Sequence, residues 1–338
     1  MKTVQELEMA LAQPSEALIR DIASLDGDIM LLGIGGKMGP SLARLALNAI
    51  REAGVSKKVY GASRFSSGGL REELERDGVR TFAADLLNDR ELEALPDVKN
   101  VIYMAGNKFG TTGNEHFTWA MNSYLPGRVA EKYRDSRIVV FSTGNVYPLT
   151  PVIQGGATES TAANPNGEYG QSCLGRERVF EYFSHKYGIP MAIYRLNYAI
   201  DLRYGVLLEI AKSVKAGKPI DITMGHANCI WQGDANEIAL RSLTVCSTPP
   251  AVINVTGPET LSMRWVAEQF GERLGVKPVF EGREAETALL SNASKANRLF
   301  GYPRVSILQM IDWIAEWVAA DGMTWNKPTH FQEREGKF

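Results

Sequence analysis

The sequence predicts an α/β protein built on a doubly wound parallel sheet. Short apolar segments of strand length recur along the chain, longer segments with helical periodicity separate them, and a glycine-rich turn follows the first apolar segment. Short apolar strands that alternate with amphipathic helices are typical of a parallel sheet covered on both faces. The expected strands lie near residues 28–33, 57–62, 79–84, 99–104, 137–142 and 190–195.

Two short helices are expected before the first strand, within residues 1–27. Pro14 and Ser15 separate them, and Ser15 is a suitable N-cap because apolar residues with helical spacing follow it. We therefore interpret residues 1–27 as a helical extension that precedes the main domain, which spans residues 28–200.

The strand–helix alternation weakens after residue 197, and mostly helical segments follow. Helices are expected near residues 203–216, 233–246, 261–274 and 306–319, with a strand-like segment at 251–255. A smaller lobe is predicted from residues 201–227 and 256–321, residues 228–255 are expected to return to the main domain, and residues 322–338 form a tail. The tail is both polar and aromatic, so the sequence leaves open whether it docks on the body.

Composition and charge exclude several classes of protein. The chain has 338 residues, which corresponds to about two domains. It has 37 basic and 39 acidic residues, so its net charge of −2 argues against a nucleic-acid binder. Its 44% hydrophobic and 22% charged residues are typical of a globular protein rather than a disordered one. No apolar run approaches the ~18 residues that a membrane span needs.

Cysteine and histidine usage gives no sign of a disulfide framework or a metal site. Cys173, Cys229 and Cys246 are scattered, and the four histidines have no paired spacing. The first residues carry acidic side chains where a signal peptide has its apolar stretch. We therefore expect a cytoplasmic protein without a bound metal.

The glycine-rich turn predicts a dinucleotide site. It reads Gly33-Ile34-Gly35-Gly36-Lys37-Met38-Gly39, between the first expected strand and a helix. Glycines in this position let the backbone approach a pyrophosphate, and the helix N-terminus supplies unpaired N–H groups. A structural glycine turn is the alternative, but the strand–turn–helix context favours the cofactor.

The end of the second strand favours NADP over NAD. An acidic residue there would bind the ribose 2′-hydroxyl of NAD, whereas this chain has Ser63 and Arg64, which suit a 2′-phosphate. A surface role for Arg64, stacked on the adenine, remains the alternative. Asp85 and Leu86 follow the third strand, where Asp85 either accepts a hydrogen bond from the adenine amino group or caps the next helix.

Several segments together resemble the extended short-chain dehydrogenase/reductases, in particular the NAD-dependent epimerase/dehydratase family. Besides the glycine turn, these are Met104-Ala105-Gly106, Ser142-Thr143-Gly144-Asn145-Val146-Tyr147, Arg195-Leu196-Asn197-Tyr198 and Asn254-Val255-Thr256-Gly257. The resemblance runs from about residue 28 to about residue 320. It implies a Rossmann-type fold, a nicotinamide dinucleotide cofactor and a substrate site in the smaller lobe.

The resemblance also implies roles for individual residues. Tyr169 matches the family's catalytic tyrosine, and Thr143 matches the Ser/Thr that hydrogen-bonds the reacting oxygen. Lys108 resembles a lysine near cofactor and substrate in UDP-galactose 4-epimerases, and Asn145 and Asn197 match substrate-side positions. The expected cofactor contacts beyond the glycine turn are Ser63, Arg64, Asp85, Leu86, Met104, Ala105, Gly106, Lys108 and Tyr169.

One departure from the family pattern affects the expected chemistry. The family motif is Tyr-x-x-x-Lys, but Tyr169 is followed four residues later by Cys173. In the family, that lysine lowers the pKa of the catalytic tyrosine. Moving a tyrosine pKa from ~10 to ~7 takes about 4 kcal/mol. Arg176 shares a helix face with Tyr169, so Arg176, Lys108 or the cofactor's own positive charge would have to replace the lysine. Cys173 is interpreted as a small buried packing residue.

These features predict an NAD(P)-dependent oxidoreductase or epimerase that transfers hydride at a carbon–oxygen centre of a sugar, nucleotide-sugar or sugar derivative. The alternatives are a dinucleotide-binding sensor or regulatory protein without catalysis and, more weakly, a non-redox lyase or isomerase. Relatives pair through two helices, here about 115–133 and 168–187, so we expect a homodimer. The second helix offers Val179, Phe180, Tyr182 and Phe183 for that interface.

Overall fold

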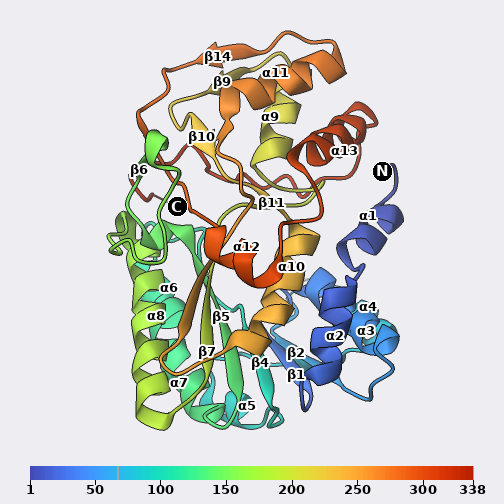
Figure 1. Ribbon diagram of the computed structural model, residues 1–338, viewed down its shortest axis with the longest axis vertical. Helices are drawn as coiled ribbons and strands as arrows, with labels where there is room; N and C mark the ends of the chain where they lie inside the picture. Colours follow the sequence, from blue (N-terminus) through green and yellow to red (C-terminus); the bar gives the residue numbers. More distant parts are fainter. Residues whose placement is uncertain (67, 338) are drawn as a thin grey trace.

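The computed structural model describes residues 1–66 and 68–337, and its main domain is built on a seven-stranded sheet (Figure 1). The strand order is β3-β2-β1-β4-β5-β7-β12, and all pairings in this sheet are parallel. The strands are β1 (Ile29–Leu32), β2 (Val59–Ser63), β3 (Arg80–Ala83), β4 (Asn100–Tyr103), β5 (Arg137–Thr143), β7 (Met191–Leu196) and β12 (Ala251–Val255). The predicted doubly wound sheet is confirmed. The strand order reverses between β1 and β4, which is where such sheets bind ligands.

Helices cover both faces of the sheet. One face packs against α2 (Glu16–Ser24), α3 (Gly39–Glu52) and α10 (Gln232–Arg241). The other face packs against α5 (Asp89–Glu93), α7 (Leu125–Lys132) and α8 (Gly167–Tyr187). Every residue of β1 is buried, because a parallel strand with helices on both sides has no solvent-facing side chains. The short helix α4 (Leu70–Asp77) lies beside β3 at the edge of the sheet.

The smaller lobe lies beyond the carboxyl ends of the strands (Figure 1). Its core contains the buried faces of α9 (Val206–Lys215), α11 (Met263–Leu274) and α13 (Ile307–Ala319). Two small sheets complete it, β9 (Pro219–Asp221) with β14 (Val279–Glu281) and β10 (His226–Ala227) with β13 (Leu261–Ser262). The expected helices are present within a few residues of their predicted bounds.

Short elements connect the two parts. They are β6 (Thr150–Pro151) with β15 (Thr287–Ala288), β8 (Ala199–Ile200) with β11 (Ile230–Trp231), and the 3-10 turns η2 (Gly144–Val146) and η3 (Val152–Gln154). The helix α12 (Ser294–Phe300) and the 3-10 turn η4 (Ser242–Val245) pack on the main domain. After the first part of the smaller lobe the chain returns to the sheet, where β12 pairs with β7 along its whole length. The helix α12 was not predicted.

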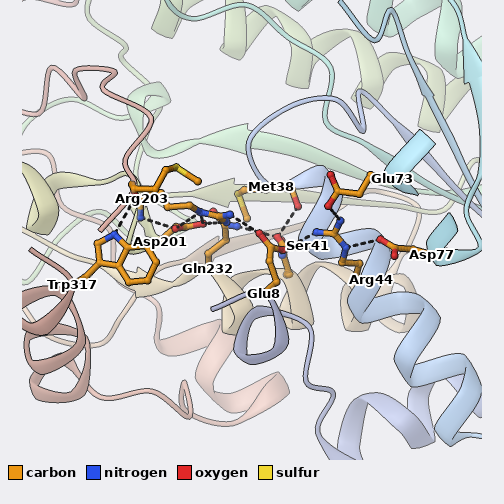
Figure 2. Close-up of polar contacts among 12 residues, drawn as sticks. Glu8, Met38, Ser41, Arg44, Glu73, Asp77, Asp201, Arg203, Gln232 and Trp317 are labelled. Atoms are coloured by element: carbon orange, nitrogen blue, oxygen red, sulfur yellow. Dashed lines mark hydrogen bonds and ion pairs between the residues drawn. The ribbon is translucent and has the colours of Figure 1, made fainter. Parts of the chain in front are cut away.

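The N-terminal extension joins both parts of the molecule. It consists of α1 (Val4–Leu11) and α2, and Ser15 caps α2 through Leu18 N–H, as predicted. The buried leucines of α1 belong to the core of the smaller lobe, whereas those of α2 belong to the core of the main domain. Figure 2 shows the Glu8 carboxylate between two guanidinium groups, 2.7 Å from Arg44 on α3 and 2.5 Å from Arg203. One carboxylate therefore links the two parts.

The C-terminal tail docks on the body. Phe331 is only 2% exposed and lies in the core of the smaller lobe. The backbone N–H of Thr329 donates to Glu209 on α9, and Arg334 donates to the carbonyl and hydroxyl oxygens of Thr287. Figure 1 shows the two ends of the chain on opposite sides of the junction between the main domain and the smaller lobe.

The two helices expected to mediate dimerisation are present, with one correction. The first is continuous from α6 (Glu115–Trp119) through the π-helical turn η1 (Ala120–Tyr124) into α7. The second is α8. Phe180 was expected to serve the interface, but it is fully buried and its ring lies 5.1 Å from that of Tyr103. Phe180 points into the protein's own core because it shares the helix face of Cys173 and Arg176. Tyr182, in contrast, is 58% exposed.

Candidate functional site

The glycine turn brings backbone to positions that side chains would fill. A Cβ on Gly33, which has φ of +91°, would lie 2.7 Å from the backbone nitrogen of Ala105 after β4. A Cβ on Gly39 would lie 2.1 Å from the carbonyl oxygen of Ile34. Both distances are too short for any side chain, so β1, β4 and α3 meet only because these residues are glycines. This cradle at the N-terminus of α3 fits a dinucleotide pyrophosphate.

Lys37 and Met38 of the turn both line the cavity and make different contacts. Lys37 crosses the cleft: its Nζ donates to the carbonyl oxygen of Ala199 at 2.8 Å and lies 4.4 Å from the ring centre of Tyr204. Burial lowers the pKa of the Lys37 ammonium group to about 8, although Asp201 favours the charged form. Met38 is buried, and its carbonyl oxygen accepts a hydrogen bond from Ser41 (Figure 2).

The residues expected around the adenosine lie together at the ends of β2 and β3. The Ser63 hydroxyl lies so close to Gly35 that a Cβ there would be 2.5 Å away. Arg64 is exposed beside it, and Leu86 is buried. Asp85 does not cap the next helix, because Asn88 caps α5. The Asp85 carboxylate instead accepts from Leu87 N–H at 3.1 Å, which fixes the turn after β3.

A cavity of about 280 Å³ extends from the glycine turn to the substrate-side residues. It contains two lysines and several hydroxyl and amide groups, and no carboxylate lines it among the residues that the structure describes. Its lining residues are Gly33, Gly36, Lys37, Met38, Met104, Lys108, Phe141, Ser142, Thr143, Asn145, Tyr169, Leu196, Asn197, Tyr198, Ala199, Ile200, Tyr204, Gly205, Val206 and Thr329. The cavity therefore brings part of the predicted cofactor side together with the predicted substrate-side residues. The predicted cofactor-side residues outside its lining are Gly35, Gly39, Ser63, Arg64, Asp85, Leu86, Ala105 and Gly106.

Tyr169 and Thr143 meet at the wall of this cavity. Burial raises the pKa of the Tyr169 phenol well above its ordinary value, and Cys173 acts in the same direction. The Arg176 charge and a hydrogen bond with Thr143 oppose this shift in pKa without cancelling it. The Thr143 hydroxyl also donates to Asn145 Oδ1 at 3.0 Å and accepts from Asn145 N–H. Tyr169 is therefore a protonated phenol in this environment.

Cys173, which lies four residues after Tyr169 on α8, is fully buried. Its neighbours are Val146, Tyr147, Ala157 and the partly buried ring of Tyr169. Burial raises the pKa of the Cys173 thiol, which keeps it neutral, and only the Arg176 charge and weaker contacts oppose that shift. A neutral thiol packed among apolar groups supplies no positive charge to the tyrosine.

Arg176 places a buried cation beneath the cofactor side of the site. Its Nη1 donates to the carbonyl oxygen of Phe141 at 2.7 Å, and its Nη2 donates to Asn122 Oδ1 at 2.6 Å. Both partners are uncharged, and its Nε is buried with no hydrogen-bond partner within the described residues. A Cβ on Gly106 would lie 2.4 Å from its Nη2, so the guanidinium directly underlies the loop after β4.

Lys108 is a second cation near the tyrosine ring. Its Nζ is 5.4 Å from the ring centre of Tyr169 and 5.4 Å from that of Phe109. Burial lowers the pKa of the Lys108 ammonium group to about 8, against a weak opposing effect from Cys173. Lys108, Arg176 and Tyr169 thus lie together, and both cations are near enough to influence the phenol.

The expected substrate-side amides differ in how they are held. Asn197 is buried, and its Nδ2 donates to the carbonyl oxygen of Leu289 at 3.3 Å. Asn145 is half-buried on the 3-10 turn η2 that follows Thr143. Both line the cavity, so a bound molecule can reach their remaining polar atoms.

Sequence reasoning missed two groups of residues near the site. Glu177 is completely buried and forms a bidentate pair with Arg195, at 2.9 Å and 2.5 Å, while Ser142 donates to the same carboxylate. Thr329 of the tail and Tyr204 line the cavity from the smaller lobe. The position of Glu177, four residues after Cys173 on the same face of α8, was the available signal for the first group. No local pattern marks Thr329.

The comparisons with known proteins agree with this architecture. The model of the NAD dependent epimerase/dehydratase family matches residues 29–224, which is more than half of the chain. The chain belongs to this family, whose members form a class of nicotinamide dinucleotide-dependent enzymes. No curated protein sequence matches the chain.

Among solved structures, the UDP-glucose 4-epimerase of Thermus thermophilus with NAD is similar, with a TM-score of 0.70 at 17% identity, covering 87% of this chain and 99% of that chain. The UDP-glucuronic acid 4-epimerase of Bacillus cereus, in complex with UDP-glucuronic acid and NAD, gives 0.68 at 18% identity over 87% and 99%. The UDP-glucose 4-epimerase of Thermotoga maritima with UDP-glucose gives 0.68 at 16% identity over 86% and 98%. At these identities the similarity establishes the fold.

Proposed function

We propose that this protein is an NAD(P)-dependent oxidoreductase or epimerase that transfers hydride at a carbon–oxygen centre of a sugar or sugar derivative. One observation carries this proposal: the glycine turn, Thr143 and Tyr169 line the same cavity. The family membership supports a nicotinamide cofactor, and the related structures contain NAD. The residues at the glycine turn fit its pyrophosphate.

In this proposal the chain's own residues hold the substrate oxygen and move its proton. When bound, the nicotinamide supplies or accepts the hydride. Tyr169, whose pKa is raised, donates its phenolic proton to a substrate carbonyl oxygen during reduction and takes it back during oxidation. Thr143 orients the same oxygen by a hydrogen bond, while Asn145 and Asn197 bind further polar groups of the substrate.

Arg176 and Lys108 take over the electrostatic role of the missing lysine. Stabilising a tyrosinate requires a nearby positive charge, which a neutral Cys173 thiol does not provide. Arg176 is the stronger contributor in this proposal because it is buried and its hydrogen-bond partners, Phe141 and Asn122, carry no charge. Lys108, whose Nζ lies 5.4 Å from the Tyr169 ring centre, adds a second charge below a pH of about 8.

The cofactor in this proposal is NADP rather than NAD. The support is local: the exposed guanidinium of Arg64 and the hydroxyl of Ser63 lie at the end of β2, where the 2′-position of the adenosine ribose is bound. The related structures contain NAD, so this preference is specific to the present chain.

The homodimer belongs to the same proposal. Tyr182 is 58% exposed, Tyr124 is 57% exposed and Trp119 is 38% exposed, and all three lie on the helices that relatives use for pairing. Burying such aromatic surface favours association. Sedimentation equilibrium at micromolar concentration should give the dimer mass, and Tyr182→Glu should shift it to the monomer mass. A wild-type monomer would contradict this part of the proposal.

A catalytically silent NAD(P) sensor is the second candidate, because the lysine of the family motif is replaced by the buried Cys173. The two candidates differ in turnover and share dinucleotide binding. A sensor would bind the cofactor and show no hydride transfer with any of a panel of sugars, sugar acids and nucleotide sugars.

Dinucleotide binding is the first experiment. The purified protein should be denatured, any released dinucleotide identified, and the stripped protein titrated with NADPH and NADH by fluorescence. We expect exchangeable binding with a preference for NADPH, and Arg64→Ala should weaken NADPH binding about tenfold or more while leaving NADH unchanged. Arg20→Ala, an exposed arginine on α2, is the matched control. Tightly held NAD would overturn the assignment of Arg64, and binding of neither dinucleotide would overturn the proposed function.

A further inference from the structure

The C-terminal tail forms one wall of the substrate end of the cavity. Thr329 is 5% exposed and lines the cavity together with the residues of the proposed catalytic site. Its N–H donates to Glu209 Oε1 at 2.6 Å and its hydroxyl donates to Glu209 Oε2 at 2.5 Å. The carboxylate on α9 therefore fixes both the backbone and the side chain of this residue.

The tail is fastened on both sides of the cleft. His330 lies against the loop after β4, with its ring 5.8 Å from that of Phe109, and Phe331 is buried in the core of the smaller lobe. Farther along, Arg334 donates two hydrogen bonds to Thr287 on β15 and a third to the sulfur of Met224. The tail thus spans the opening between the loop after β4 and the smaller lobe.

The last part of the tail closes the remaining gap beside Asn145. The backbone of Gly336 packs on Gly167 at the start of α8, where a Cβ on Gly167 would lie 2.3 Å from its carbonyl oxygen. Between this contact and the 3-10 turn η2, only a crevice of about 20 Å³ is left. Its lining residues are Asn145, Tyr147, Leu149, Asn166, Leu289, Glu333, Arg334 and Gly336.

The volume behind the tail limits what the site can hold. The cavity of about 280 Å³ reaches the glycine turn, where it shares Gly36, Lys37, Lys108 and Tyr204 with a second cavity of about 940 Å³, so only its substrate end lies behind the tail. Sites that enclose a ligand of drug size have volumes of about 300–1,000 Å³. Asn145 lines both this cavity and the crevice of about 20 Å³, so a substrate extended beyond Asn145 by a nucleoside diphosphate would meet the tail residues that line the crevice.

We propose that the tail selects a small substrate, a free sugar or sugar acid without a nucleotide, and that Thr329 contacts it. This inference rests on the proposed function, because it names the substrate class of the same site. The Thr329 hydroxyl hydrogen is directed at Glu209, so its oxygen offers lone pairs to the cavity. It accepts a hydrogen bond from a substrate hydroxyl, which suits a polyhydroxylated molecule.

The test compares the binding of UDP-glucose to the full chain and to a chain that ends at Gln332. The shortened chain keeps Thr329 and Phe331 and removes the residues that close the crevice beside Asn145. Equilibrium dialysis in the presence of NADPH should show no binding to the full chain at millimolar UDP-glucose, and affinity roughly tenfold or more higher for the shortened chain. Arg334→Ala provides a full-length variant in case the shortened chain does not fold. Lys337→Ala, which removes an exposed tail charge, is the control and should behave as the full chain.

Each outcome decides the inference. Binding of UDP-glucose to the full chain would overturn it, because the tail would not exclude the nucleotide. Absence of binding to all chains, including Arg334→Ala, would overturn the role of the tail as the excluding element. NADPH titration of the same samples reports separately on the proposed function: if the full-length wild-type chain binds both NADPH and UDP-glucose, only this inference is refuted.

Discussion

Two consecutive residues of α8 show how differently one helix can bury charge. Glu177 is buried against Arg195 in a bidentate ion pair that also receives hydrogen bonds from its surroundings. Arg176 is buried one residue earlier, and its guanidinium donates only to the neutral oxygens of Phe141 and Asn122. The Glu177 charge is neutralised by a direct ion-pair partner, whereas the hydrogen-bond partners of the Arg176 guanidinium carry no charge.

This difference separates structural from functional charge. The ion pair of Glu177 holds β5, β7 and α8 together, and the Glu177 charge raises the pKa of the Cys173 thiol by less than the Arg176 charge lowers it. An uncompensated cation acts on titratable neighbours, and its field lowers the pKa of both Tyr169 and Cys173. We therefore assign a structural role to Glu177 and an electrostatic role to Arg176.

Breaking the compensated pair should have the largest effect. Glu177→Gln leaves the buried Arg195 without its carboxylate, which should lower the free energy of unfolding by about 3–5 kcal/mol. Denaturant unfolding measures this loss. Glu181→Gln is the matched control, because Glu181 pairs with Arg178, whose side chain is 63% exposed, and such pairs contribute about 1 kcal/mol or less. Similar losses for the two variants would contradict the structural role of Glu177.

Restoring the family's lysine should be the next largest change. Cys173→Lys introduces a longer side chain into a fully buried position and a second cation beside Arg176. Overpacking alone costs about 1–3 kcal/mol, and the uncompensated like charge adds to it. We expect lower stability in denaturant unfolding and no gain in hydride transfer. Cys173→Ser should leave stability closer to that of the wild type. A more active Cys173→Lys would instead favour the sensor over the enzyme.

Removing the uncompensated cation tests its action on the tyrosine. Without Arg176 the pKa of Tyr169 rises further, so the rate of substrate oxidation should fall about 100-fold at neutral pH. Because deprotonated Tyr169 is the base in that direction, the rising limb of the pH–rate profile should move to higher pH in Arg176→Met. The exposed Arg178→Met is the control. A lower rate with an unchanged pH limb would show that Arg176 acts only through packing.

The smallest expected effect concerns Lys108. Burial lowers its pKa to about 8, so it is charged below that pH and loses its charge as the pH rises past it. As the pH rises past this pKa, affinity for NADPH should weaken about fivefold. A change of this size is expected from the loss of one partly exposed charge contact. Lys108→Arg keeps its charge and should move the decline to higher pH. Lys37 has a pKa of about 8 as well, so a shift seen only in Lys37→Arg would assign the decline to Lys37.

The sequence predicted those parts of the site that rest on local patterns. The glycine turn was recognisable because glycines at the spacing of Gly33 and Gly39, between a strand and a helix, are typical of a dinucleotide-binding turn. The strands were recognisable because a strand buried on both faces is apolar throughout. The position of Tyr169 followed from the motif around it.

Contacts between distant segments could not be predicted in the same way. Lys37 meets Ala199 across 162 residues of sequence, and Thr329 meets Glu209 across 120, so no local pattern marks either contact. Glu177 resembles a surface residue in the sequence, since a single carboxylate gives no sign of the arginine that neutralises it. Phe180 was placed on the wrong face because a helix with apolar residues on several sides has no clear phase.

The position of Glu8 between Arg44 and Arg203 has a consequence for motion. Separating the main domain from the smaller lobe would break an ion pair whose arginine side chains are only 16% and 7% exposed. Domains joined by small polar contacts usually swing about a hinge, but this junction also shares the apolar face of α1. A hinge motion that opens the cleft would therefore have to break these ion pairs as well as the packing of α1 against α3 and α10.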